Sequence, residues 1–223
     1  MGGFIPLGDA SRRPLRFSAV TVGIILLNCW VFFKELMLGD RYVLMWSAIP
    51  YRVTHGHHWI TLMTSMFMHA GWMHIIGNMI YLWAFGREME EAMGSLRYLV
   101  FYLAGGVVAM LAQIMADPFS RIPSLGASGA IAAVMGAFIV TFPRDRIRTV
   151  IFFLIFIRVT FIPAILLIGF WFLMQVLNFG QVAQVRTGGV AYLAHIGGFL
   201  FGVATARLFV NPRRIGWRTG PYA

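Results

Sequence analysis

The sequence predicts an all-α polytopic membrane protein: a bundle of six transmembrane helices with a long, partly embedded first loop. Its 223 residues are 59% hydrophobic and 12% charged, and the mean hydropathy is +0.76. A soluble domain of this length cannot bury so much apolar surface. Apolar runs that approach the roughly 20 residues needed to cross a bilayer recur along the chain, and short arginine-bearing loops separate them.

The apolar runs predict six spans, at residues 17–38, 73–88, 96–115, 128–142, 161–179 and 190–209. Residues 39–72 are too polar to cross and too apolar to float freely, so an interfacial loop with Trp and Tyr at headgroup depth is expected. The fourth run is short, which a helix beginning below the membrane surface would explain. Residues 151–157 are interpreted as an apolar lead-in to the fifth span.

These runs divide the chain into an amino-terminal segment, a membrane domain and a basic tail, at residues 1–16, 17–209 and 210–223. The net charge of +10 comes mostly from arginine, and nucleic-acid binding and membrane orientation are its two common explanations. No nucleic-acid-binding motif is visible, and arginines in short loops favour orientation. Most of the 18 basic residues fall on the side that holds both termini. We therefore expect both termini in the cytoplasm, in a bacterial or archaeal cytoplasmic membrane.

The first apolar run is long and has no Ala-x-Ala cleavage site, so we expect a retained span rather than a cleaved signal. Cys29 is the single cysteine, which excludes a disulfide within the chain and a cysteine metal site. His55, His57 and His58 cluster in the first loop without carboxylate or cysteine neighbours, so a hydrated loop is favoured over a metal centre. No cofactor is predicted.

Four polar side chains lie near the beginning of the second, fourth and sixth predicted spans: His74 and Asn78, then Ser128, then His195. With six spans, these three all run from the outer face inward, so the four side chains lie at similar depths. Polar groups inside spans are costly and usually mark function. Taken one at a time, each has an ordinary structural explanation. His74 and Asn78 could bond neighbouring helices, Ser128 could cap its helix or allow close packing, and His195 could be a packed histidine. Their shared depth favours a common site.

Small residues repeat at every fourth position on two of these spans. The two stripes are Ala194, Gly198, Gly202 and Ala206 on the sixth span, and Ser128, Ala132 and Gly136 on the fourth. Such stripes let helix backbones approach closely. Ser128 heads one stripe and His195 lies beside the other, so the hydroxyl and the imidazole can come within hydrogen-bond reach.

Three sequence segments carry a resemblance to a known family: HAGWMHIIGN at 69–78, GASGA at 126–130 and AHIGGFLFG at 194–202. In this order on six spans, over about residues 17–209, the chain resembles the rhomboid intramembrane serine proteases. The glutamate-bearing turn at 88–95 is also typical of that family. The GxSxG elbow of soluble hydrolases does not fit, because residue 130 is alanine and no strand precedes the serine.

The resemblance implies a serine endopeptidase that cleaves transmembrane segments of other membrane proteins near their outer end. Its partners would be those substrates and the lipid bilayer. Ser128 would be the nucleophile and His195 the general base, a dyad without a carboxylate. His74, Asn78 and the backbone N–H of Ser128 would donate hydrogen bonds to the oxyanion. The fifth span would flank the substrate's route.

Two positions depart from the family's pattern. Many members have an aromatic residue four positions after the serine, which stacks on the catalytic histidine, and here that position is Ala132. Tyr192 is not expected to replace this ring, because it lies nearly a full turn from His195 on the same helix. Many members also have Trp-Arg in the first loop, where this chain has Trp59-Ile60.

Two residues outside the proposed dyad are expected to have structural roles. His69 is predicted to order the first loop by hydrogen bonding. Glu90 is predicted to stabilise the inner turn after the second span, with Arg97 or Arg87 as its partner.

Two other classes of function remain open. A catalytically inactive rhomboid-like protein that binds membrane helices would fit the same fold, although the intact pair of Ser128 and His195 argues against it. A transporter or channel would place His74 and His195 on a proton path, but the sequence shows no inverted repeat.

Overall fold

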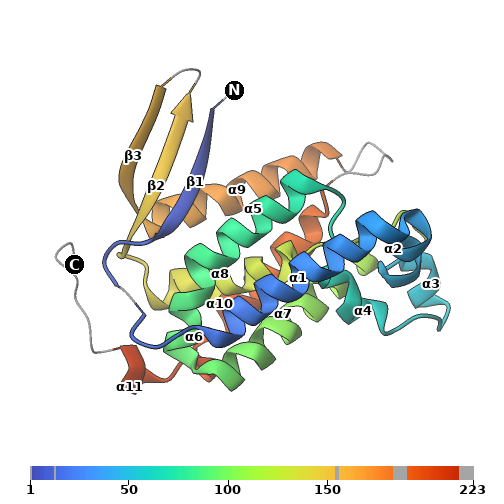
Figure 1. Ribbon diagram of the computed structural model, residues 1–223, viewed down its shortest axis with the longest axis horizontal. Helices are drawn as coiled ribbons and strands as arrows, with labels where there is room; N and C mark the ends of the chain where they lie inside the picture. The colour runs from blue at the N-terminus through green and yellow to red at the C-terminus, as the bar shows by residue number, and fades with distance from the viewer. Residues whose placement is uncertain (1, 13, 154–155, 183–189, 216–223) are drawn as a thin grey trace.

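The computed structural model describes residues 2–12, 14–153, 156–182 and 190–215. They form a bundle of helices from whose side a small sheet projects (Figure 1). In chain order the elements are β1 Gly2–Asp9, α1 Ala19–Leu38, α2 Asp40–Trp46, α3 Pro50–Thr54, α4 Thr61–Thr64, η1 Ser65–Phe67, α5 Trp72–Tyr81, η2 Leu82–Gly86, α6 Arg87–Met93, α7 Ser95–Ala116, α8 Ser128–Thr141, β2 Arg146–Phe153, β3 Phe156–Pro163, α9 Ala164–Val182, α10 Tyr192–Phe209 and α11 Pro212–Ile215.

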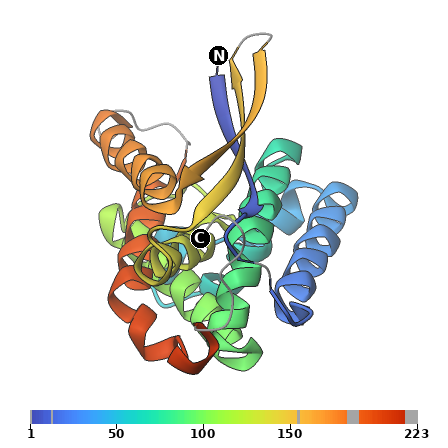
Figure 2. The same cartoon turned by 90° about the vertical axis from the view of Figure 1, so that its left-hand side faces the viewer.

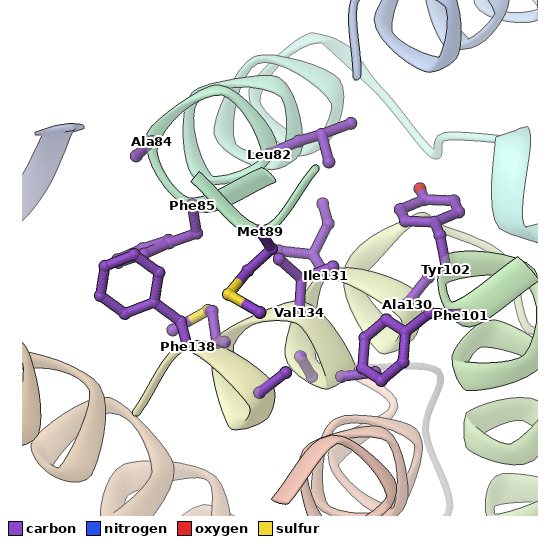
Figure 3. Close-up of a cluster of buried hydrophobic side chains, with 14 of the residues drawn as sticks. Leu82, Ala84, Phe85, Met89, Phe101, Tyr102, Ala130, Ile131, Val134 and Phe138 are labelled. Carbon is purple, nitrogen blue, oxygen red and sulfur yellow. The ribbon is translucent and has the colours of Figure 1, made fainter. Parts of the chain in front are cut away.

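Helix α8 forms the core of the bundle. Its residues 129–138 are all buried. Figure 3 shows its apolar side chains packed among Phe85 of η2, Met89 of α6, and Phe101 and Tyr102 of α7. Alanine and glycine keep α8 narrow, so that neighbouring helices close around it at short range.

Three described helices, α1, α7 and α10, are long and apolar enough to cross a membrane, while α8 and the stretch Ala164–Gly180 of α9 are shorter apolar helices. This confirms a mostly helical membrane protein, and the count of six spans stays a prediction. The predicted second span falls on a helix that continues from α5 through the π-helical turn η2 into α6. The short fourth run is α8, a helix of 14 residues.

Residues 39–72 fold into short helices that are fastened to the bundle. Ala48 and Ser124 exchange two backbone hydrogen bonds, of 3.0 and 2.7 Å, which join this segment to the approach to α8. The backbone N–H of His69 donates to both carboxylate oxygens of Glu35 on α1, at 3.1 Å each. His69 thus orders the loop through its backbone, whereas its buried ring nitrogens have no partner among the described residues. The embedding of this segment in the membrane stays a prediction.

The all-α prediction is wrong in one region, where β1, β2 and β3 form an antiparallel sheet in that order. Residues 151–157 were predicted as an apolar lead-in; those that the structure describes, 151–153 and 156–157, belong to β2 and β3. The helix of the predicted fifth span, α9, begins at Ala164 rather than at residue 161. The β-branched and aromatic residues of this segment favour strands. Average hydropathy does not distinguish them from a membrane helix. Figure 2 shows the sheet rising between α9 and α5.

Glu90 on α6 holds the first turn of α1. Its carboxylate accepts the backbone N–H groups of Val20 at 3.0 Å and Thr21 at 2.8 Å. It also accepts the hydroxyls of Thr21 and Ser95, each at 2.8 Å. Glu90 therefore stabilises the turn after the predicted second span by bonding the first residues of α1 and α7. The sequence had predicted an arginine as its partner instead.

Candidate active site

The fold brings Ser128 and His195 into direct contact. Ser128 is the first residue of α8, and His195 lies in the first turn of α10. Ser128 Oγ and His195 Nε2 are 2.7 Å apart. Glycine permits this approach, because a Cβ built on Gly198 would lie 2.1 Å from the carbonyl oxygen of Gly129. The predicted close approach of the two helices is confirmed, but Gly198 and Gly202 face Gly129 and Ala133, one position after the predicted Ser128 and Ala132.

A third residue, Gln175 on α9, bonds the other nitrogen of the histidine. Gln175 Oε1 lies 2.8 Å from His195 Nδ1, and Gln175 Nε2 donates to the carbonyl oxygen of Trp171 at 3.0 Å. Because that carbonyl can only accept, the amide nitrogen must face it and Oε1 must face the histidine. Nδ1 therefore carries the proton, and Nε2 presents its lone pair to the hydroxyl of Ser128. Gln175 was not among the site residues predicted from the sequence, although a polar side chain inside an apolar helix is a signal that indicates such a residue.

The histidine ring has aromatic neighbours, but none from α8. Ala132 is fully buried and supplies no ring. Trp171 of α9 lies against His195 with ring centroids 5.7 Å apart and an angle of 37° between the planes. Tyr192 meets the imidazole edge-on, at 6.4 Å and 86°, so it contacts His195 without stacking on it. The tilted ring beside His195 thus comes from α9 and not from α8.

His74 lies near the serine and carries its proton on Nε2. Its Nδ1 accepts the backbone N–H of Ala70 at 3.3 Å, so the proton of the neutral ring is on Nε2. A Cβ built on Gly126 would lie 2.9 Å from that Nε2 and 3.6 Å from Ser128 Oγ. His74 and Ser128 therefore border the same point. Gly126 keeps this point open, and its φ of +128° also favours glycine.

Asn78 follows His74 by one helical turn and lies on the same face of α5. It is 7% exposed, and its Nδ2 has no hydrogen-bond partner among the described residues. An unpaired buried donor costs about 1–3 kcal/mol, so Asn78 Nδ2 is free to donate to an acceptor that enters the site. The first N–H groups of α8, beginning at Ser128, are also unused by the helix itself.

The family of the chain follows from its similarity to known proteins. Residues 56–212, well over half of the chain, match the Rhomboid domain. The chain belongs to the rhomboid family. This finding confirms the family resemblance inferred from the three sequence segments.

Named relatives within the family include proteases. The chain is 28% identical to "Rhomboid protein 1, mitochondrial" of Saccharomyces cerevisiae over 182 residues, which cover 79% of this chain and 46% of the relative. It is 39% identical to "Rhomboid protease GluP" of Bacillus subtilis over 79 residues, 35% of this chain and 15% of the relative. "Putative rhomboid protease YdcA" of Bacillus subtilis is 27% identical over 131 residues, 56% of this chain and 63% of the relative. The chain therefore matches less than two thirds of the length of each of these relatives.

Proposed function

We propose that this rhomboid-family chain is an intramembrane serine endopeptidase that cleaves transmembrane segments of other membrane proteins near their outer end. The observation that carries the proposal is the 2.7 Å contact between Ser128 Oγ and His195 Nε2. The proposal includes the six-span membrane domain at 17–209, and both flanking segments, 1–16 and 210–223, on the cytoplasmic side.

In the first half of the reaction, Ser128 Oγ attacks the carbonyl carbon of the scissile bond while its proton passes to His195 Nε2. The same Nε2 then returns the proton to the leaving amine, so that the C–N bond breaks and an ester on Ser128 remains. In the second half, water gives a proton to Nε2 and its oxygen attacks the ester. The carboxylic acid product leaves, and Ser128 regains its proton.

Three donors would stabilise the oxyanion that forms in each half. They are His74 Nε2, Asn78 Nδ2 and the backbone N–H of Ser128. The buried, unpaired state of Asn78 Nδ2 supports this role, because the oxyanion would supply the missing acceptor. Removal of one such donor typically costs about 3–4 kcal/mol of transition-state stabilisation.

Covalent labelling by a fluorophosphonate, read by intact mass and peptide mapping, tests the proposal. We expect the purified protein to label at Ser128 alone, and Ser128→Ala to abolish labelling. His195→Ala should slow labelling by roughly 10²–10⁴-fold, the typical contribution of a positioned general base. Ser120→Ala, which changes a half-buried serine of the loop before α8, is the matched control and should label like the wild type.

Two results would count against the proposal. If His195→Ala labels as fast as the wild type, the assignment of the base is wrong. If the folded wild-type protein does not label at all, a catalytically inactive protein that binds membrane helices becomes the better hypothesis.

A further inference from the structure

The histidine of the proposed dyad has no carboxylate to hold it, yet both of its ring nitrogens are bonded. Gln175 and His195 are each only 8% exposed, so their hydrogen bond of 2.8 Å is shielded from water. The second bond of Gln175, to the carbonyl oxygen of Trp171, fixes which end of the amide faces the ring. The structure therefore selects one tautomer of His195, the one that leaves Nε2 free to accept a proton.

We propose that Gln175 is the positioning residue of the Ser128–His195 dyad, and that it makes the general base dependent on the position of α9. This inference rests on the proposed protease function. Gln175 Oε1 would take the place that a carboxylate has in a catalytic triad, and it would hold Nδ1–H and the plane of the ring. Ser128 and His195 lie on α8 and α10, so their alignment depends on a third helix that carries neither of them.

Helix α9 meets α10 through side chains rather than through backbone. Phe172 stacks on Phe199 with centroids 4.2 Å apart and an angle of 20° between the rings. Trp171 contacts both Phe199, at 6.4 Å, and His195, at 5.7 Å. Other apolar side chains of α9 are exposed: Leu166, Phe170, Leu173 and Leu177. Helix α9 therefore lies at the edge of the bundle, beside the projecting sheet (Figure 2).

The inner end of α9 is anchored, and this makes the position of Gln175 sensitive to tilt. Strand β3 runs directly into α9, and Ala164 N–H donates to the carbonyl oxygen of Asp145 at 2.8 Å. Gln175 lies about 17 Å along the helix from Ala164, at roughly 1.5 Å per residue. A tilt of about 5° around the anchored end would move Gln175 by about 1.4 Å, enough to break a hydrogen bond of this length. A small displacement of α9 would therefore release the base.

Two substitutions of Gln175 separate positioning from packing. Gln175→Met keeps the approximate volume but removes the acceptor, and Gln175→Glu keeps an acceptor and adds charge. Leu173→Met is the matched control, since it places the same residue on an exposed part of the same helix. The measurement is the rate of fluorophosphonate labelling at Ser128 between about pH 5 and 10, with thermal unfolding recorded for each variant.

We expect Gln175→Met to slow labelling by about 10- to 100-fold, a part of the roughly 10²–10⁴-fold that a positioned base supplies. The acid limb of its pH profile should move to lower pH, because the imidazolium loses an acceptor that stabilises it. Gln175→Glu should stay within about tenfold of the wild type, with the limb moved to higher pH, because a carboxylate stabilises the imidazolium more strongly than an amide does. Leu173→Met should match the wild type.

The same variants have a readout that does not require activity. In ¹⁵N-histidine spectra, assigned with His195→Ala, the wild-type His195 should show a protonated Nδ1 and an unprotonated Nε2. Gln175→Met should lose this preference.

Three outcomes would overturn the inference. One is a Gln175→Met variant with the wild-type rate and pH profile. Another is an equal loss of labelling rate in both Gln175 variants that is accompanied by a lower unfolding temperature, while the acid limb of the pH profile stays where it is in the wild type. The third is a wild-type spectrum with Nε2 protonated.

If the wild type labels at Ser128 and Gln175→Met labels at the same rate, only the positioning role fails. If the wild type never labels at Ser128, the protease proposal itself fails.

Discussion

The two interfaces that α10 makes near the candidate site differ in kind. Against α8, its contacts are backbone on backbone: a Cβ on Gly202 would lie 2.0 Å from the carbonyl oxygen of Ala133. Against α9, its contacts are side chain on side chain, through the stacked pair of Phe172 and Phe199 and the bond from Gln175. The first interface leaves no room for adjustment, whereas the second can loosen by rotation of a few side chains.

This difference assigns a separate task to each interface. The α8–α10 contact fixes the distance between Ser128 and His195, because it fixes the two backbones. The α9–α10 contact fixes the orientation and tautomer of the histidine, because it supplies the acceptor for Nδ1. We therefore expect damage to the first to be structural and damage to the second to be mainly kinetic.

The largest effect is expected at the backbone contact. Gly202→Ala places a methyl group against Ala133 and forces the helices apart, at a cost of at least about 3 kcal/mol, the upper part of the usual range for overpacking. Thermal unfolding should show a large loss of stability, and Ser128 labelling should disappear with it.

Gly169→Ala on α9 is the control for this change, since a Cβ there has nothing within 4 Å. It should leave stability unchanged or slightly raised, because alanine favours a helix over glycine by about 1 kcal/mol. Equal stability of Gly202→Ala and Gly169→Ala would contradict the difference proposed between the two interfaces.

A smaller effect is expected at the side-chain contact. Phe172→Ala removes the ring that seats α9 and leaves Gln175 unchanged, so labelling should fall by roughly tenfold while most of the fold is retained. The acid limb of the pH profile should move in the same direction as in Gln175→Met. The double variant Phe172→Ala/Gln175→Met should label no more slowly than Gln175→Met alone, because both substitutions disrupt the same hydrogen bond, between Gln175 and His195. Additive losses would show that Phe172 acts independently of Gln175.

The smallest effect concerns the anchor of α9. Burial and the nearby carboxylate of Asp145, itself paired with Arg12, raise the pKa of Asp9 at the foot of the sheet to about 8. The folded protein therefore binds this proton more tightly than the unfolded chain, whose Asp has a pKa of about 3.9. The resulting stability is fully present below that lower pKa and is lost as pH rises through about 8. Thermal unfolding should shift to lower temperature between pH 6 and 9.

Asp9→Asn keeps the side chain uncharged throughout this range, so its unfolding temperature should change less with pH than that of the wild type. A wild type and a variant with the same pH dependence would show that Asp9 is already ionised in the folded protein.

The features of the fold and of the site that could be predicted from the sequence are those that depend on residues close together in the chain. The small-residue stripes predicted the contact of α8 with α10. The shared predicted depth of four polar residues indicated a common site, formed by Ser128, His195, His74 and Asn78. The structure brings Ser128 into contact with His195, and it places His74 beside the same point.

The parts that the sequence did not reveal depend on distant pairings. Strand β1 joins a hairpin more than 130 residues later in the chain, and no local pattern specifies such a partner. The two strands of the hairpin are rich in β-branched and aromatic residues, but their high hydropathy favoured a membrane interpretation. Gln175 was visible as a polar residue in an apolar run, yet only the packing of α9 against α10 shows what it bonds.

The most direct test of the central claim is cleavage of a transmembrane substrate in proteoliposomes. The substrate should be a single-span membrane protein whose helix carries glycine or proline near its outer end, because the dyad can reach the peptide bond only where the helix unwinds. We predict that the wild-type protein cleaves it there, as mass spectrometry of the products would show, and that Ser128→Ala does not. Cleavage by Ser128→Ala at the wild-type rate would contradict the account.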